Sequence, residues 1–201
     1  MKRLWNEKHG NWHAELSATD EKNAFEGNRL NCAVQSLFSG GIMVGWEYGE
    51  VDKAVSKTKE YLELDSVIIF EAFFVHEGLL CLADVVIKDK GRITLIEAKS
   101  SNNPKVSQRD DFEHIQDAAF QAYVMKQCGY KPDEVKLLHA NGECIWPNHD
   151  NLFKILDISE DVFLRFDEVE LVSNRLLNDL NKSRCPQQKI GKFCKCVFWR
   201  S

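Results

Sequence analysis

The segment that decides the fold is SVIIFEAFFVHEGLLCLADVVIKDKGRITLIEAK, residues 66–99. It contains three apolar runs, at 66–75, 79–88 and 92–99, which are rich in Val, Ile, Leu and Phe. Each spacer between them ends in the glycine that a tight turn favours. The segment therefore predicts a meander of three antiparallel strands. Both faces of each strand are largely apolar, so we expect other elements to cover the sheet on both sides.

The segments around this meander predict helices and a further strand. Apolar residues recur at helical spacing and end at glycines, whereas shorter runs alternate or stay apolar throughout. Helices are predicted at 20–38, 108–129 and 159–181, a strand followed by a helix at 50–62, and a fourth strand at 134–140. This order predicts an α/β fold with a mixed central sheet flanked by helices.

Size and composition favour one soluble domain. The 201 residues, 44% hydrophobic and 28% charged, suit a single domain over 1–201 with an irregular, basic, Cys-containing tail at 183–201. No apolar run is long enough for a membrane span, and the N-terminus has no signal-peptide core, so a cytoplasmic location is expected. The net charge of −5 argues against a broad polyanion binder but permits a local basic site.

Three acidic residues interrupt the three apolar runs: Glu71, Asp84 and Glu97. Polar groups within buried strands are costly unless they are paired or bound to a ligand. If Glu77-Gly78 and Lys90-Gly91 are two-residue turns, Glu71 lies opposite Asp84, and Asp84 lies opposite Glu97. Directly opposed Cβ atoms are roughly 4.5–5.5 Å apart. The hairpins therefore predict a row of three carboxylates across adjacent strands.

Such a row predicts a metal site. Three anions this close repel one another, and a divalent cation removes the repulsion; carboxylate oxygens select hard ions such as Mg²⁺ or Mn²⁺. Lys99 lies two residues beyond Glu97, on the same face, where it could orient a water molecule or stabilise charge on a phosphate. The alternative interpretation is that the acids face solvent and Lys99 extends its charge into water. A one-residue slip in either hairpin would separate the acids.

Asp84, followed thirteen residues later by Glu97-Ala98-Lys99, resembles the D…ExK motif of the PD-(D/E)XK nuclease superfamily. The segment order is similar to the αβββαβ, restriction-endonuclease-like core of that superfamily. Further segments resemble its RecB-like branch, which includes CRISPR-associated iron–sulfur exonucleases: KRLWNEKHG (2–10), FEGNRLN (25–31), IFEAFF (69–74), LADVV (82–86), LIEAKSS (95–101) and DAAFQAYVMKQCGY (117–130). The resemblance covers most of residues 2–145.

This resemblance implies a metal-dependent DNA nuclease that hydrolyses phosphodiester bonds with Mg²⁺ or Mn²⁺. The implied action is exonuclease-like, in repair, recombination or defence. It implies that Asp84 and Glu97 are metal ligands, with the Ala98 carbonyl as a further ligand. Lys99 would handle the attacking water and the phosphate charge, and Glu71 would be an auxiliary acid that completes the metal shell. The implied partner is DNA, with ends or single strands favoured.

The RecB-like branch also carries a glutamine–tyrosine motif on the helix after the third strand. Gln121 and Tyr123 lie there, although not at the usual four-residue spacing. Asp117 and Gln121 do have that spacing, and with His114 they form one helical stripe. We expect Gln121 to touch the site or the DNA; the alternative is a solvated helix face. The candidate DNA contacts are Tyr123, Lys105 and Arg109.

The tail cysteines are candidate ligands for a second metal site. Iron–sulfur relatives use one cysteine near the N-terminus and three in the tail, and this tail offers Cys185, Cys194 and Cys196. Three thiolates do not complete the four-ligand set of a 4Fe–4S cluster, which leaves open a zinc site completed by a histidine. Where many relatives carry a histidine on the first helix, this chain has Asn31; Glu26 could contribute instead.

Two alternatives to an exonuclease-like function stay open. One is a catalytically degenerate DNA-binding module that kept the nuclease fold, which Asn31 and the incomplete cysteine set favour. The other is a structure-specific or restriction endonuclease with the same core. The presence of Glu71, Asp84, Glu97 and Lys99 together favours catalysis.

Overall fold

The structure, a computed structural model, describes residues 2–10, 18–47, 49–102, 113–145 and 151–186. Its elements in chain order are α1 (Lys2–Lys8), α2 (Ala18–Leu37), β1 (Ile42–Met43), α3 (Val51–Leu62), β2 (Ser66–His76), β3 (Leu79–Asp89), β4 (Arg92–Lys99), α4 (Glu113–Gln127), β5 (Glu134–Ala140), β6 (Phe153–Asp157), α5 (Ser159–Phe163) and α6 (Phe166–Leu180).

The sheet is mixed, as predicted. Its six strands lie in the order β1-β2-β3-β4-β5-β6. The β2–β3, β3–β4 and β5–β6 pairs are antiparallel, whereas the β1–β2 and β4–β5 pairs are parallel. Because parallel neighbours need a crossover connection, α4 carries the chain from β4 back to the start of β5.

The predicted turns fix the register of the meander. Glu77-Gly78 joins β2 to β3, and Lys90-Gly91 joins β3 to β4. All four turn residues have positive φ, which is the type I′ geometry that matches the twist of the flanking strands. Both hairpins therefore have the register that two-residue turns require.

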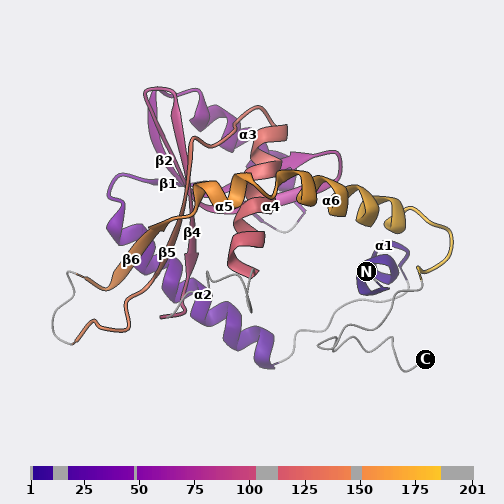
Figure 1. Cartoon of the computed structure of the whole chain (residues 1–201), viewed down its shortest axis with the longest axis horizontal. Helices are drawn as coiled ribbons and strands as arrows, with labels where there is room; N and C mark the ends of the chain where they lie inside the picture. The colour runs from indigo at the N-terminus through magenta and orange to yellow at the C-terminus, as the bar shows by residue number, and fades with distance from the viewer. Residues whose placement is uncertain (1, 11–17, 48, 103–112, 146–150, 187–201) are drawn as a thin grey trace.

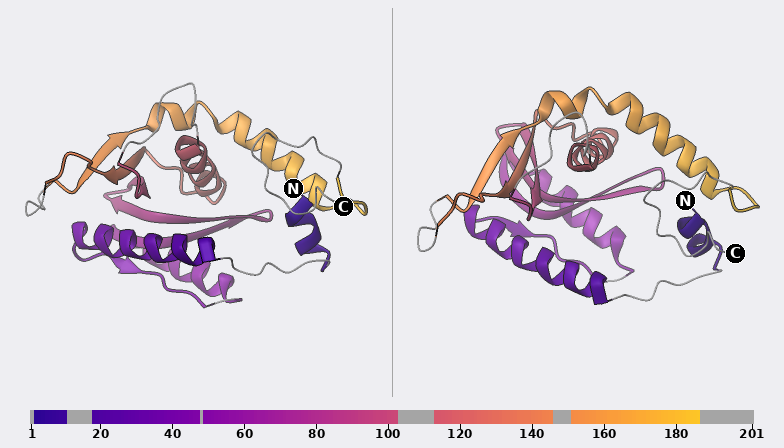
Figure 2. Two further views of the ribbon diagram at one scale, coloured as in Figure 1. Left: turned by 90° about the horizontal axis from the view of Figure 1, so that it is seen from below. Right: turned by 60° about the horizontal axis from the view of Figure 1, so that its bottom comes forward.

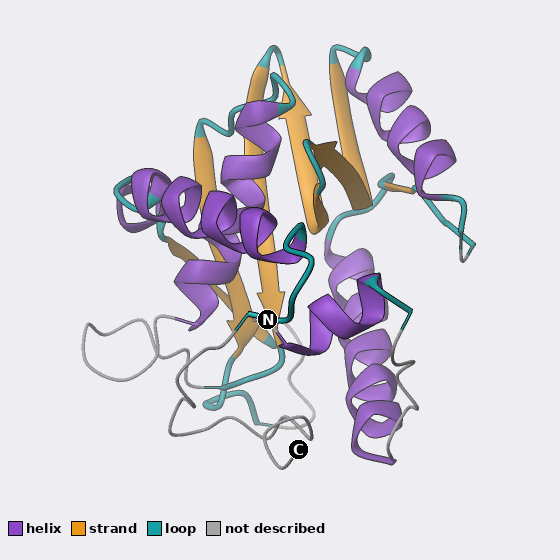
Figure 3. Ribbon diagram, turned by 90° about the vertical axis from the view of Figure 1, so that its right-hand side faces the viewer, coloured by secondary structure: helices purple, strands orange, loops and turns teal. Residues whose placement is uncertain are grey.

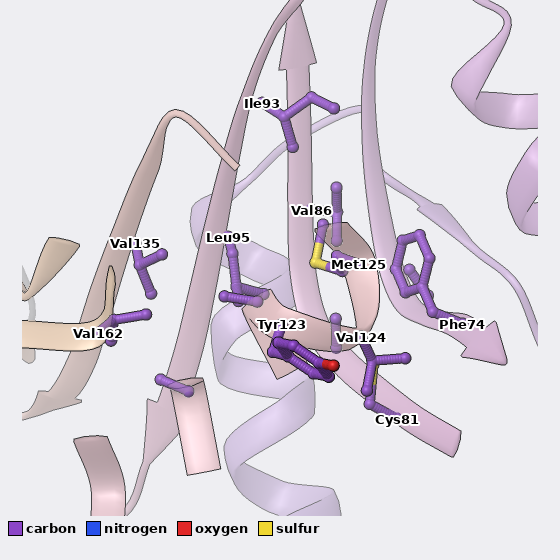
Figure 4. Packing of buried hydrophobic residues seen from close by; sticks show 14 of the residues in the cluster. Phe74, Cys81, Val86, Ile93, Leu95, Tyr123, Val124, Met125, Val135 and Val162 are labelled. Atoms are coloured by element: carbon purple, nitrogen blue, oxygen red, sulfur yellow. The ribbon is translucent and has the colours of Figure 1, made fainter. Parts of the chain in front are cut away.

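Helices cover both faces of the sheet. Figures 1 and 2 show α2 on one side and α4 with α6 on the other. Figure 3, viewed from the second side, shows helices lying across the strands. The main core lies between the sheet and α3, α4, α5 and α6, with Ile93, Leu95, Met125, Val135 and Val162 among its buried residues (Figure 4). A smaller α2-side cluster consists of Val34, Phe70, Val85, Ile96, Ala98 and Leu138.

Several elements differ from the sequence prediction, including α1, which was not predicted. The segment 50–62 is helix α3 from Val51 onward rather than a strand and a helix, and the edge strands β1 and β6 were not predicted. β1 has two residues, and most of β6 is exposed or half-buried, so neither shows a clear apolar pattern. The predicted helix at 159–181 is divided, because the Arg165 amide donates to the Val162 carbonyl and tightens the turn between α5 and α6.

The N-terminal helix is fastened to the end of α6. The Trp5 indole donates a hydrogen bond to the Lys182 carbonyl at 2.8 Å, and Lys8 donates to the Asn181 side chain. Figure 1 shows α1 beside the far end of α6. Among the described helices, none combines the length and apolar character that crossing a bilayer requires.

Candidate active site

The candidate site lies at a fork between β3 and β4. Pairing of these strands begins at the Lys90-Gly91 turn and ends at Val85 opposite Ile96, although both strands continue beyond this point. The last residues of β4 pair only with β5. The β4 backbone therefore lacks a strand partner on its β3 side. The Asp84 carboxylate takes that place, because its Oδ2 accepts the Ala98 amide at 2.8 Å.

β2 is kinked directly opposite Asp84. The β2–β3 ladder keeps one register on both sides of Glu71, but Glu71 and Asp84 are themselves unpaired. Glu71 has φ of 52°, a left-handed conformation that is uncommon for a residue other than glycine. Phe70 belongs to the α2-side cluster, whereas Ala72 belongs to the main core. Since alternate residues of a regular strand share a face, β2 changes the face it presents at Glu71.

Glu97 and Lys99 are held from the α4 side. The Lys99 Nζ lies 2.7 Å from Glu97 Oε1 and 2.9 Å from Asp117 Oδ2. The Gln121 Nε2 donates to Glu97 Oε2 at 2.5 Å. Glu97 is 4% exposed, which is low for a carboxylate, and both of its oxygens have partners. The Glu97 carboxylate is therefore fixed by the Lys99 ammonium and the Gln121 side-chain amide.

Glu71 is held from the α2 side. The Asn31 Nδ2 donates to Glu71 Oε1 at 3.0 Å. The site thus receives side chains from both helical layers, Asn31 from α2 and the Asp117–Gln121 stripe from α4. The side chain of Glu26, the alternative contributor from α2, lies outside the described part of the structure.

Burial and like charge perturb Asp84. Burial is the main cause that raises the pKa of Asp84 from 3.8 to about 7, and the charges of Glu97 and Glu71 raise it further. The Ala98 amide and the Lys99 ammonium act in the opposite direction. For Lys99, burial lowers the pKa, but the Glu97 and Asp117 carboxylates outweigh burial, so its pKa is raised overall. A strongly perturbed acid beside a fixed lysine is typical of functional sites.

Both hairpins have the predicted registers, but neither Glu71 with Asp84 nor Asp84 with Glu97 forms a ladder pair. Asp84 lies close enough to Glu97 and Glu71 for their charges to raise its pKa, and Lys99 pairs with Glu97. The donor chemistry of the carboxylates and the Ala98 carbonyl suits a hard divalent cation. Within the described residues, however, no three His, Cys, Asp or Glu side chains are arranged to hold a metal ion. The oxygens of Glu97 and one oxygen of Glu71 are instead occupied by side-chain donors. A cation would have to replace some of these donors.

One predicted contact is wrong, and others cannot be located. Tyr123 is 7% exposed and packs edge-on against Phe166 in the main core (Figure 4), so it faces α6 rather than a nucleic acid. Lys105 and Arg109 lie outside the described residues, as do Cys194 and Cys196. Cys185 is described and is a half-buried free thiol.

The sequence gives Asp117 no role beyond its helical stripe, yet it forms an ion pair with Lys99. The sequence signal that could have identified Asp117 is that the spacing of two residues on β4 matches the spacing of two residues on α4. Glu97 and Lys99 are alternate residues of β4, and Gln121 and Asp117 are one turn apart on α4, so the two pairs can face each other in register.

The fold and the site define an α/β protein with a buried carboxylate–lysine cluster at a strand fork. No protein-family model and no curated protein matches this chain. It is similar to the crystal structure of SSO0001, with 12% identity, 86% of each chain covered and a TM-score of 0.38. It is also similar to a protein named a putative exonuclease from Eubacterium rectale, with 15% identity, 98% of this chain and 79% of that chain covered, and a TM-score of 0.46. At these values neither likeness assigns a family or an activity.

Proposed function

We propose that this chain is a metal-dependent nuclease of the PD-(D/E)XK, RecB-like type that hydrolyses DNA phosphodiester bonds, with exonuclease-like action in repair, recombination or defence. The observation that carries the proposal is the meeting of Asp84, Glu97 and Lys99 at the β3–β4 fork. Two buried carboxylates and an ammonium are the groups that bind a cation and stabilise a phosphate undergoing attack.

In this proposal, Asp84 and Glu97 hold Mg²⁺ or Mn²⁺, together with the Ala98 carbonyl and with Glu71 as an auxiliary ligand. When bound, the ion lowers the pKa of water and neutralises charge on the phosphate. The raised pKa of Asp84 supports this role, because a buried carboxylate beside another one gains from a nearby cation.

Lys99 and Gln121 orient the reacting groups. The Lys99 ammonium, fixed between Glu97 and Asp117, stabilises negative charge on the phosphate oxygens. The Gln121 Nε2 is used by Glu97, while its Oε1 is buried and has no hydrogen-bond partner among the described residues. This carbonyl oxygen can accept a hydrogen bond from the attacking water and so orient it.

The test is cleavage of linear and circular, single- and double-stranded DNA with Mg²⁺ or Mn²⁺, using wild type, Lys99→Ala and Lys136→Ala. Lys136 is a matched control, because it is a half-buried lysine on the adjacent strand that pairs with Glu134 at 2.8 Å. We expect Lys99→Ala to lower the cleavage rate by roughly 10²–10³-fold, the usual effect of removing a group that stabilises developing charge. Lys136→Ala should cleave at the wild-type rate.

The substrate forms separate the modes of cleavage. An exonuclease degrades linear DNA and leaves circular DNA intact, whereas an endonuclease of either kind cuts both. If wild type and Lys99→Ala behave alike on every substrate with either metal, the nuclease proposal is lost.

A non-catalytic DNA-binding module is the second candidate. The observation that favours it is that side-chain donors occupy both Glu97 oxygens, so the site is satisfied without a cation. This candidate predicts DNA binding that is the same in EDTA and in Mg²⁺, with no cleavage product under either condition.

A further inference from the structure

β4 and α4 face each other through matched polar pairs. The first pair is Glu97 with Gln121 at 2.5 Å, and the second is Lys99 with Asp117 at 2.9 Å. Because α4 is the crossover helix between two parallel strands, it runs opposite to β4. Two strand residues advance about 6.6 Å and four helical residues about 6 Å, so the two spacings stay in step.

Ser101 and His114 lie beyond these two pairs, Ser101 along the chain after β4 and His114 in the first turn of α4. Ser101 is the next alternate residue after Lys99, just beyond the end of β4, and His114 lies three residues before Asp117 on the same stripe of α4. Ser101 Oγ and His114 Nδ1 are both buried, and neither has a hydrogen-bond partner in the part of the chain that the structure describes. Each of the first two pairs is joined by a hydrogen bond, whereas Ser101 Oγ and His114 Nδ1 are polar groups that are not used by the described residues.

Buried polar groups without partners are rare in native proteins, because each one costs stability. A serine hydroxyl and a histidine Nδ1–H can both donate, and serine hydroxyls commonly bind phosphate oxygens of nucleic acids. We propose that Ser101 Oγ and His114 Nδ1 bind one oxygen of the substrate phosphate that flanks the scissile one. This inference rests on the proposed nuclease function, since it places the flanking phosphate beside Ser101, two residues beyond Lys99.

The proposal assigns Ser101 and His114 to substrate binding rather than to the chemical step. It also makes a stability prediction that separates it from a structural role. Removing an unpartnered buried polar group leaves the melting temperature unchanged or raises it, whereas removing a structural hydrogen bond lowers it. Ser101→Ala and His114→Ala should therefore melt at or above the wild-type temperature while binding DNA more weakly.

Binding is measured by fluorescence anisotropy of a labelled single-stranded oligonucleotide in EDTA, so that no cleavage occurs. We expect Ser101→Ala and His114→Ala each to raise Kd roughly 10-fold, the effect of losing one hydrogen bond to a charged group. The matched controls are Ser36→Ala, on α2 with its hydroxyl bonded to the Ala33 carbonyl, and His76→Ala, at the β2–β3 turn. Both should bind as wild type does.

A second series of oligonucleotides, each with one neutral methylphosphonate linkage, locates the contact. Wild type should lose about 10-fold in affinity at one linkage. The Ser101→Ala, His114→Ala double variant should lose nothing further there. Equal losses in wild type and double variant at every linkage, or wild-type affinity in both single variants, would overturn the inference.

The phosphate contact and the nuclease activity can be refuted separately. Wild-type cleavage without the methylphosphonate coupling refutes the phosphate contact and leaves the nuclease intact. The coupling without cleavage supports the contact and refutes the nuclease. Absence of both DNA binding and cleavage refutes the two together.

Discussion

Replacing Asp84 by asparagine should stabilise the protein while abolishing the proposed nuclease activity. The pKa of Asp84 is raised to about 7 from its ordinary 3.8. At about 1.36 kcal/mol per pKa unit, keeping this buried group ionised costs at most about 4 kcal/mol of folding free energy above pH 7. Asparagine carries no charge, and its side-chain oxygen can still accept the Ala98 amide that Asp84 accepts at 2.8 Å.

The direction in which stability changes with pH follows from proton binding to Asp84. Between pH 4 and pH 7 the folded protein holds a proton on Asp84 that the unfolded chain has lost, so wild-type stability falls as the pH rises through this window. Asp84→Asn removes this dependence. We therefore expect Asp84→Asn to be more stable than wild type by about 1.6 kcal/mol at pH 5 and by up to about 4 kcal/mol at pH 8, with a rise in melting temperature of roughly 2–4 °C for each kcal/mol gained.

The assay is thermal or urea unfolding in EDTA at pH 5, 6, 7 and 8. Asp133→Asn is the matched control, because Asp133 is an exposed carboxylate that accepts another β4 amide, that of Ile93, at 2.7 Å. Asp133→Asn should show the same change in stability at pH 5 and pH 8. The reasoning is refuted if Asp84→Asn shifts stability equally at both pH values, or if it is less stable than wild type at pH 8.

Two further outcomes follow from the same structure. Mg²⁺ or Mn²⁺ at ten times its Kd should stabilise wild type by about 1.4 kcal/mol at pH 8, and by less at pH 6, where a proton competes for Asp84. The ion should not stabilise Asp84→Asn. Thermal-shift measurements at both pH values check this, and an unchanged wild-type melting temperature would contradict it. Lys90→Asn should raise stability by roughly 0.5–1 kcal/mol, because Lys90 has φ of 49° before Gly91 and Asn-Gly suits a type I′ turn; urea unfolding that shows a loss would count against the turn assignment.

The meander could be predicted from the sequence because local signals agree along it. The apolar runs, the glycines at the turn ends and the strand lengths all give the same register. The edge strands β1 and β6 could not be predicted in this way. β1 has only two residues, and β6 exposes Ile155 at the sheet edge, so their strand conformation comes from pairing with β2 and β5.

Strand register is also the part of the candidate site that the sequence could predict, whereas the side chains that come from the helices could not be predicted. The β3–β4 register predicts Asp84 opposite Glu97, but the ladder ends at Val85 opposite Ile96, and Asp84 instead accepts the Ala98 amide. The partners from the helices depend on tertiary packing, which sequence spacing does not supply. Asp117 and Tyr123 are six residues apart on α4, yet one pairs with Lys99 and the other lies in the main core.

The kink at Glu71 gives the site its connection to both helical layers. In a regular strand, Glu71 would continue the alternation of β2, and Phe70 and Ala72 would share a face. The left-handed backbone at Glu71 instead divides those neighbours between the two clusters, while its carboxylate bonds to Asn31 on α2. Glu97, one fork away, is held from α4 through Gln121. A relative shift of α2 and α4 would therefore change the separation of the two outer carboxylates, so the packing of both helices on the sheet sets the geometry in which a cation could be bound.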